Sequence, residues 1–333
     1  MGTVLRATAC LIAGLTVAGL TTGCGESGSS GTEAPASVSA AGCAPVAGDQ
    51  LVVLEDDKKL QNADNIIAAI NAKVADPALV AAVDKVADAL DTPKLIALNK
   101  AVDIDRKTSQ VAAGEFAQSA NLTAGLAKGP GGAIRIGAAD FSESATLGAL
   151  YEIVLDSIGY DATVTQIGNR ELYQPQLEKG DIGVTAEYAA TMAEFLNKKV
   201  NGATASPVAS SDVEATVTAL KSVGQKVGIS FGKPAKAATQ NAFAVTKALA
   251  DKHSLRTLSD FASKCSGAAS ILAAGAECPQ RPFCQQGLEQ KYGIQFGRFA
   301  SLDAGGPQTK NGLKTGTVTI GLVFSSDGSL AAG

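Results

Sequence analysis

"IRIGAADFSESATLGALYEIVLDSIGY", residues 134–160, is a stretch whose hydrophobic period changes halfway along. Ile134 and Ile136 alternate with other residues as in a β-strand, whereas the apolar residues of the second half recur at every third or fourth position, as on the buried face of a helix. Asp140 and Glu143 have the spacing of a capping box between the two halves. The stretch therefore predicts a strand, a short loop and a helix.

The loop in this stretch lies where small ligands often bind. At the carboxyl end of a strand in an open α/β sheet, free backbone amides and the helix dipole point toward solvent. Phe141 and Ser142 occupy this loop, and Ser142 could bind an anionic group. The alternative is that both residues only cap and pack the helix.

Strands and helices continue to alternate after this stretch, which is typical of a mostly parallel sheet flanked by helices. A second series of alternating segments begins near residue 239. The predicted fold class is therefore α/β with two lobes, and a cleft between them is a natural site for a small molecule. The segments of the first series after residue 160 are "ATVTQIG" (162–168), "ELYQPQLEKG" (171–180), "IGVTAEY" (182–188) and "ATMAEFLNKKV" (190–200).

The part of the chain before this region has a different pattern. "LVVLEDD" (51–57) predicts a buried strand, and residues 64–121 predict successive amphipathic helices. Asp76 and Thr92 each precede a proline, as capping residues do at a helix start. "AKGPGG" (127–132) indicates a linker.

The composition limits the classes of function. The chain has 333 residues, 46% of them apolar, and a net charge of −4 without a basic run, which argues against a nucleic-acid partner. A single histidine, His253, and the lack of a CxxC spacing argue against a zinc site. The chain shows no nucleophile elbow, acid and base pair or phosphate loop, so we expect no catalytic residues, metal or cofactor.

The N-terminus predicts export. Arg6 precedes an uncharged apolar run that is short for a membrane span, and "TTGC" follows, so residues 1–23 are a predicted signal peptide. Gly23 and Cys24 end this segment like a lipobox, which predicts a lipid on Cys24 and anchoring to the outer face of the cell membrane; the alternative is a simple secretory signal. Residues 24–48 have the composition of a flexible tether.

Export makes disulfides possible, because they persist outside the cytosol. Cys10 leaves with the signal peptide and Cys24 would carry lipid, so four of the six cysteines remain and allow three pairings. The short loop "ECPQRPFC" favours a bridge between Cys278 and Cys284, which leaves Cys43 to pair with Cys265.

Five segments are distinctive in content and order: "IRIGAADFSES", "GNRELYQPQLEKGDIGVTAEY", "QNAFAV…LRTLSDFA", "CPQRPFCQQGLEQKYGIQF" and "LVFSSDG". Together they resemble the substrate-binding proteins of osmoprotectant ABC importers, the glycine betaine, choline and carnitine class. The resemblance implies a periplasmic-binding-protein-like fold of type II, in which a solute binds between two lobes that close about a hinge. It also implies a membrane permease and its ATPase as partners. We expect a monomer.

One departure from the family concerns the order of segments. "LVVLEDDKKLQNADNIIAAINAK" (51–73) follows the "FSSDG" strand in the family pattern, but here it opens the mature protein. The resemblance therefore implies a circularly permuted chain joined through the 127–132 linker. Adjacent old termini would place Gly333 near Gln50. A Cys43–Cys265 bridge would then restore the link between the leading strand and the second lobe.

A second departure concerns the ligand. The family encloses a quaternary ammonium with a pattern like "DxYxEY". In this chain the aligned stretch is "GVTAEY" (183–188): Gly183 and Thr185 replace the Asp and the first Tyr, while Glu187 and Tyr188 remain. Phe243 stands where a Tyr is usual. The sequence therefore supports the importer role more firmly than betaine as the solute.

The remaining candidates lie at strand ends and in loops. Arg170 and Tyr173 follow a strand, and the Arg170 guanidinium could hold a carboxylate bidentately or form a surface ion pair. Asn241 and Phe243 share one side of a strand after the crossover between lobes. The full set of candidate ligand-binding residues is Phe141, Ser142, Arg170, Tyr173, Glu187, Tyr188, Asn241, Phe243, Arg281 in the disulfide loop, and Asp327 in the "SSDG" turn.

The sequence thus predicts an extracytoplasmic solute-binding protein of an ABC importer, with a small polar or zwitterionic solute between two lobes. A surface receptor for a sensor and, less favoured, a hydrolase are the alternatives. The expected organisation is a signal peptide (1–23), a tether (24–48), a leading strand and helices packing on lobe 1 (49–128), lobe 1 (129–238) and lobe 2 (239–333).

Overall fold

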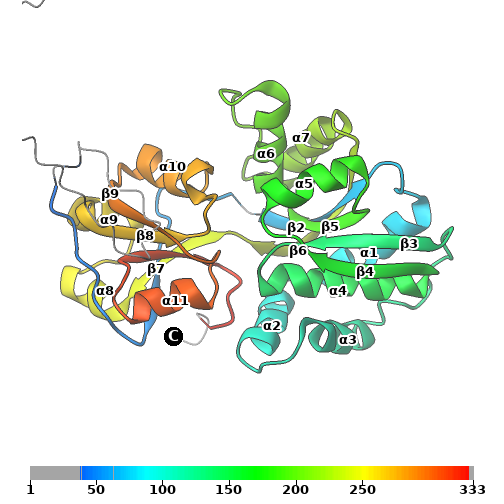
Figure 1. Cartoon of the computed structure of the whole chain (residues 1–333), viewed down its shortest axis with the longest axis horizontal. Helices are drawn as coiled ribbons and strands as arrows, with labels where there is room; N and C mark the ends of the chain where they lie inside the picture. Colours follow the sequence, from blue (N-terminus) through cyan, green and yellow to red (C-terminus); the bar gives the residue numbers. More distant parts are fainter. Residues whose placement is uncertain (1–37, 39, 63, 330–333) are drawn as a thin grey trace, which may run out of the picture. The chain divides into compact units, whose positions relative to one another are not determined.

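Two β-sheets of five strands each form the framework of the protein in the computed structural model, which describes residues 38, 40–62 and 64–329 (Figure 1). Helices cover the sheets, so the predicted α/β class with two lobes is confirmed. No helix in the described part of the chain is long and apolar enough to cross a membrane. The predicted signal peptide and Cys24 lie outside the described residues.

The sheet of the first lobe has the order β4-β3-β5-β2-β6. β3 is parallel to β4 and β5, whereas β2 is antiparallel to both β5 and β6. One apolar cluster packs α1 to α4 against the sheet, and a second packs α5 to α7. The elements are β2 Asp64–Asn71, α1 Pro77–Ala89, α2 Thr92–Asp103, α3 Ser109–Ser119, β3 Gly132–Ala138, α4 Ser142–Ser157, β4 Tyr160–Gln166, α5 Arg170–Lys179, β5 Val184–Tyr188, α6 Ala189–Asn201, α7 Val213–Gln225 and β6 Ile229–Thr239.

The sheet of the second lobe has the order β1-β7-β10-β8-β9. β10, β8 and β9 are parallel neighbours, and β7 is antiparallel to β10 and β1. The chain passes between the two sheets after β1 and again at Gln240, between β6 and β7. The elements are β1 Leu51–Leu54, β7 Asn241–Thr246, α8 Lys247–His253, α9 Leu258–Cys265, β8 Gly267–Ala274, a 3₁₀ turn Cys278–Gln280, α10 Gln285–Gly287, a π-helical turn Leu288–Tyr292, β9 Phe296–Ser301, α11 Pro307–Lys314 and β10 Ile320–Phe324.

The start of the predicted helical region is a strand. Residues 64–71, expected to open the first helix, form β2, and every residue of β2 is buried. A short, continuously apolar run has no clear period, because a strand covered on both faces needs none. Three helices do follow, α1 to α3.

The two predicted helix starts have different outcomes. Asp76 caps α1 as predicted, because its side chain accepts from the Ala78 and Leu79 amides. The cap of α2 is Asp91 instead of Thr92. Thr92 instead accepts from the Ala238 amide at 3.0 Å, which ties α2 to the end of β6.

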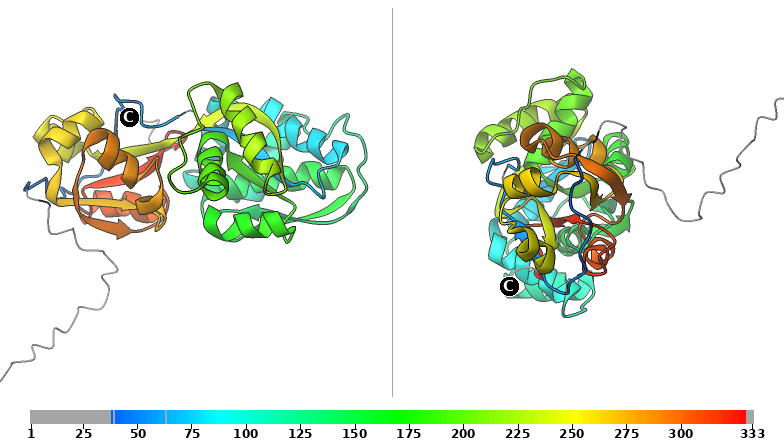
Figure 2. Two further views of the ribbon diagram at one scale, coloured as in Figure 1. Left: turned by 90° about the horizontal axis from the view of Figure 1, so that it is seen from above. Right: turned by 90° about the vertical axis from the view of Figure 1, so that its left-hand side faces the viewer.

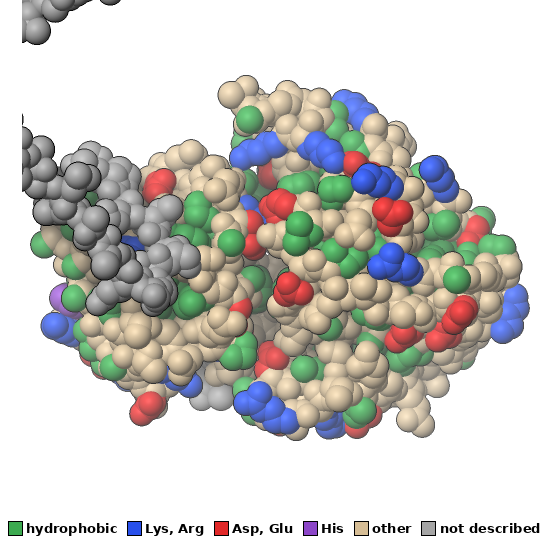
Figure 3. Space-filling model, in the orientation of Figure 1, with side chains coloured by type: hydrophobic (Ala, Val, Ile, Leu, Met, Phe, Trp, Pro, Cys, Tyr) green, Lys and Arg blue, Asp and Glu red, His purple; other side chains and the backbone are tan. Residues whose placement is uncertain are grey.

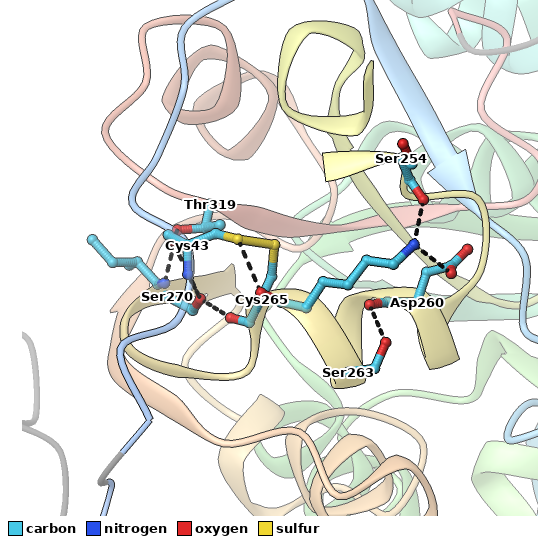
Figure 4. Close-up of a disulfide and its surroundings, with 9 residues drawn as sticks. Cys43, Ser254, Asp260, Ser263, Cys265, Ser270 and Thr319 are labelled. Carbon is cyan, nitrogen blue, oxygen red and sulfur yellow. Dashed lines mark hydrogen bonds and ion pairs between the residues drawn. A yellow bond between two sulfur atoms is a disulfide. The ribbon is translucent and has the colours of Figure 1, made fainter. Parts of the chain in front are cut away.

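Both predicted disulfides are present, Cys43–Cys265 and Cys278–Cys284. The first attaches the leading segment to the second lobe, where Ser270 accepts from the Cys43 amide at 3.1 Å and Thr319 donates to the Cys43 carbonyl at 3.2 Å (Figure 4). The predicted tether was too long, because Ala41 already bridges to Gly267.

The sequence suggested that the leading strand packs on the first lobe, but it belongs to the second lobe. β1 pairs with β7, and its blue ribbon lies among the yellow-to-red elements of the second lobe (Figure 2). Leu54 pairs with Phe243 and is buried in the core of the second lobe, which accounts for this placement. The leading segment therefore contributes one strand to each sheet.

Circular permutation stays a prediction. Gly333 lies outside the described residues. Gln50 accepts from Lys247 beyond one end of β7, whereas Ser325 donates to Gln240 beyond the other end. The end of β10 therefore lies at one end of β7, and Gln50 lies at the other.

Candidate functional site

A cavity of about 970 Å³ opens between the two lobes, and both of them line it. The first lobe contributes the carboxyl ends of β3 and β5 and the start of α5; the second contributes the segment after β8 and the end of β10. The hinge residues Gln240 and Asn241 also line it. Several acidic side chains border the recess between the lobes on the face shown in Figure 3.

Three aromatic rings meet in this cleft, and we call them the aromatic wall: Phe141, Tyr188 and Phe324. Phe141 is the N-cap of α4, and its ring lies 6.3 Å from that of Tyr188 and 5.5 Å from that of Phe324, centroid to centroid. Tyr188 ends β5 in the first lobe and Phe324 ends β10 in the second. The wall therefore spans both lobes.

Arg170 and Tyr173 line the cleft as predicted, but their polar atoms are already used. Arg170 donates to both carboxylate oxygens of Glu187, at 2.8 and 2.6 Å, and Tyr173 donates to the same carboxylate at 2.7 Å. Although burial alone would lower the pKa of Arg170, the Glu187 charge raises it above its ordinary value. Glu187 is fully buried beneath these residues instead of lining the cleft, so the group supports the cleft floor.

Asp64, the first residue of β2, also lines the cleft. Its carboxylate accepts from the amides of Ala190 at 2.6 Å and Thr191 at 3.1 Å, at the start of α6. Burial raises the pKa of Asp64 to about 7, against the opposing effects of the Thr191 amide and the Arg170 charge. Asp64 thus occupies a helix terminus that an anionic solute could otherwise use.

Glu143 does not form the predicted capping box. The N-cap of α4 has no side-chain hydrogen bond, because Glu143 turns inward and is 4% exposed. One carboxylate oxygen accepts from the Tyr188 hydroxyl at 2.8 Å; the other accepts from Asn99 at 2.5 Å and from Ser326 at 2.7 Å. Burial raises the pKa of Glu143, although these three hydrogen bonds act in the opposite direction.

Two polar contacts join the lobes at the edge of the cleft. Arg281, in the loop closed by Cys278 and Cys284, donates to Glu171 of α5 at 2.9 Å. Burial alone would raise the pKa of Glu171, but the Arg281 guanidinium lowers it. Asn169 contacts Glu277 at 3.5 Å.

The other candidates have separate outcomes. Asn241 lines the cleft and donates to the Phe283 carbonyl at 3.0 Å. Ser142, Phe243 and Asp327 do not line it. Phe243 is 1% exposed because β7 lies between β1 and β10 and its side chain packs in the core of the second lobe. Asp327 pairs with Lys310.

Sequence reasoning missed Phe324, Asp64 and the inward position of Glu143. A usable signal existed for Phe324, since it ends a strand directly before a turn, as Tyr188 ends β5. Asp64 had no such signal, because its segment was assigned to a helix.

A search for metal-ligand geometry in the described part of the chain finds Cys43, His253 and Cys265 close together. Both cysteines belong to one disulfide, so neither offers a thiolate. This group therefore does not fit a metal ion.

A comparison with protein families matches residues 44–119 and 132–332 to the substrate binding domain of the ABC-type glycine betaine transport system. No curated protein matches the chain. The family has the type II periplasmic-binding fold, in agreement with the two-lobed architecture, and its members are binding proteins and not an enzyme family. The chain belongs to this family: it is an extracytoplasmic solute-binding protein of an ABC importer for glycine betaine-type solutes, which it supplies to a membrane permease and its ATPase.

Proposed function

We propose that the cleft binds one compact zwitterion of the glycine betaine type, with its quaternary ammonium against the aromatic wall. The observation that carries the proposal is the meeting of three rings from two lobes in one cleft. A cation over a ring face gains about 0.5 to 2 kcal/mol. Three faces therefore supply a substantial part of the roughly 8 kcal/mol that micromolar binding requires.

Phe324 answers the main objection to a betaine-type solute. Thr185, which replaces an expected tyrosine, is fully buried within β5 and does not line the cleft. Phe324 supplies a ring from the second lobe instead. The set of aromatic rings around the solute therefore loses a ring on β5 and gains one on β10.

The carboxylate of the solute needs donors that are still free. Arg170 is committed to Glu187, and Arg281 to Glu171. Gly275 and Ala276 line the cleft directly after β8, and within the described ranges their amides donate no hydrogen bond. We place the carboxylate at these two amides, because backbone N–H groups at a strand end bind anions without adding a net charge.

Closure follows from the position of the wall. A solute that touches Phe141 and Tyr188 of one lobe and Phe324 of the other favours the closed state by its differential affinity. The two passages between the sheets serve as the hinge. A permease can then distinguish loaded from empty protein by shape.

The attachment to the membrane and the oligomeric state belong to the same proposal. Cys24 carries the lipid that holds the protein at the outer face of the membrane, and the protein works there as a monomer. Mass spectrometry of the protein from membranes would detect an acylated Cys24, and Cys24→Ala would release the protein into the medium. A Cys24→Ala protein that stays in the membrane fraction contradicts the anchor.

The proposal is tested by isothermal titration of residues 40–333 with glycine betaine, choline, carnitine and proline. We expect Tyr188→Ala and Phe324→Ala each to weaken glycine betaine binding by about tenfold or more, the equivalent of one lost ring contact with its packing. Val111→Ala is the matched control, since Val111 is an exposed residue of α3 that does not line the cleft. Unchanged affinity in both wall variants would remove the aromatic wall from the site.

A further inference from the structure

Glu143 is a buried carboxylate whose charge no cation in the described residues compensates. Its three neighbours, Tyr188, Asn99 and Ser326, are all hydrogen-bond donors, and none is charged. Glu143 takes part in none of the ion pairs formed by the described residues. Burial without a cation raises the pKa of Glu143, and the three donors, which bind the ionised form, oppose that rise. A cation at the aromatic wall would supply the compensating charge that the described residues lack.

Tyr188 connects this carboxylate to the cleft. The Tyr188 hydroxyl donates to Glu143 on one side, and the Tyr188 ring belongs to the aromatic wall on the other. Glu143 itself does not line the cleft. Its negative charge therefore lies beyond the hydroxyl end of the Tyr188 ring, outside the lining of the cleft.

We propose that Glu143 sets the preference of the cleft for a cationic head group over a neutral group of the same shape. The inference rests on the proposed function, because it assumes that the head group lies against the aromatic wall. Glu143 acts through Tyr188 and is a positioning residue for the charge of the solute, without touching the solute.

The physical reason is that a cation at this wall gains binding free energy from two electrostatic attractions. It gains from the negative face of the Tyr188 ring, and donation of the hydroxyl to a carboxylate makes that face more electron-rich. It also gains from the Glu143 charge itself, because the surroundings are buried and screen the charge poorly. A neutral group of the same shape gains only the apolar contact.

The test uses a pair of ligands with one shape and different charge: glycine betaine and 3,3-dimethylbutanoate, in which a tert-butyl group replaces the trimethylammonium. Their dissociation constants are measured by titration calorimetry for the wild type and for Glu143→Gln. We expect the wild type to prefer glycine betaine. In Glu143→Gln the ratio of the two affinities falls by about tenfold, and 3,3-dimethylbutanoate binding changes little.

Glu143→Gln keeps the volume of the side chain and lets the buried polar groups around it keep their hydrogen bonds. The glutamine Oε1 can still accept from Asn99 and Ser326, while its amide nitrogen replaces the oxygen beside Tyr188, whose hydroxyl can accept as well as donate. Glu143→Asp tests the charge separately from the geometry. It disturbs the geometry more but keeps the carboxylate, so it should retain more of the preference for glycine betaine than Glu143→Gln does. Ser326→Ala is the comparison, because it removes one donor to Glu143 and keeps the carboxylate and the Tyr188 bond, so we expect it to retain more of the preference than Glu143→Gln.

The outcomes separate the inference from the proposed function. A wild type that prefers 3,3-dimethylbutanoate overturns the proposed head-group site, and the role of Glu143 with it. A wild type that prefers glycine betaine, combined with an unchanged ratio in Glu143→Gln, overturns only the role of Glu143. Equal weakening of both ligands in Glu143→Gln, or a loss of preference in Glu143→Asp as large as in Glu143→Gln, assigns Glu143 a purely structural role and also overturns the inference.

Discussion

At the scale of single residues, some side chains line the cleft and others lie beneath the lining and hold it in place. The aromatic wall lines the cavity, whereas Glu187 and Glu143 do not: Glu187 accepts from Tyr173 beside the wall, and Glu143 accepts from Tyr188 of the wall itself. Three buried carboxylates lie at or beneath the cleft: Asp64, Glu143 and Glu187. The different partners of the last two, an arginine for Glu187 and neutral donors for Glu143, give them different roles.

Asp64 makes stability depend on pH. Its pKa rises to about 7 in the folded protein, so folding favours the protonated form; this contribution is complete below a pH of about 4 and is lost as the pH rises toward 7. We expect the free energy of unfolding of the wild type to fall relative to Asp64→Asn, by roughly 1 kcal/mol per pH unit in that window. Asparagine keeps the cap of α6. Urea unfolding at several pH values measures the difference, and parallel curves for the two proteins would contradict it.

Residue identity was easier to predict from the sequence than residue partners. Phe141, Arg170, Tyr173, Tyr188, Asn241 and Arg281 were chosen from the sequence and line the cleft, and their contact with a solute stays a prediction. Glu143 was not, because its partner Ser326 is 183 positions away. A capping box is a local pattern, and a buried tertiary contact overrode it.

At the scale of elements, the loop closed by Cys278 and Cys284 holds one side of the cleft edge. It presents Arg281 to Glu171 across the cleft. Both side chains are partly exposed, so the pair is worth only about 0 to 1 kcal/mol and yields to salt. Such a contact suits a closure that must reopen.

We expect Arg281→Gln to speed dissociation of the bound solute by about twofold to fivefold at low salt, because the closed state loses this ion pair. The difference from the wild type should shrink at high salt. Stopped-flow fluorescence measures the rate. Asp251→Asn is the control, since it removes an exposed ion pair within α8 that does not join the lobes. An effect of equal size in the control would exclude a role in closure.

Element type was predictable wherever a period was present. The strands and helices between β3 and α6 follow the expected order, and α1 begins after its predicted cap. β2 was taken for a helix, because its fully buried sequence carries no alternation. Knowledge of which faces are covered, which only the whole fold supplies, decides such cases.

At the scale of the whole molecule, the chain crosses between the two lobes, and its leading segment contributes a strand to each sheet. The leading segment gives β1 to the second sheet and β2 to the centre of the first. The number of lobes could be predicted from the alternating pattern. The allocation of the leading strand could not, because hydrophobicity says that a strand is buried but not in which sheet.

The Cys43–Cys265 bridge spans 222 positions, so it restricts the unfolded chain strongly. We expect Cys43→Ser with Cys265→Ser to lower the free energy of unfolding by about 2 to 5 kcal/mol. Cys278→Ser with Cys284→Ser is the matched comparison and should cost less, because its loop spans 6 positions. Guanidinium denaturation compares the two variants; the reverse order would contradict an origin in the unfolded state.

Closure itself can be measured on the whole molecule. We expect glycine betaine to reduce the radius of gyration of residues 40–333 in small-angle scattering, because a solute that touches both lobes favours the closed state. Tyr188→Ala at the same betaine concentration should keep the larger radius. A radius that does not respond to saturating betaine in the wild type would mean that binding proceeds without hinge motion.

The site at which the leading segment is fastened has a mechanical consequence. Cys43 is bonded to α9 and lies beside β8, in the interior of the second lobe. A force applied to the chain ahead of Cys43 is therefore borne by a covalent cross-link and passes into one lobe, bypassing both strands of the hinge. Under the proposed lipid anchor, the second lobe is therefore the one held in place, and movement of the first lobe puts no load on the segment ahead of Cys43.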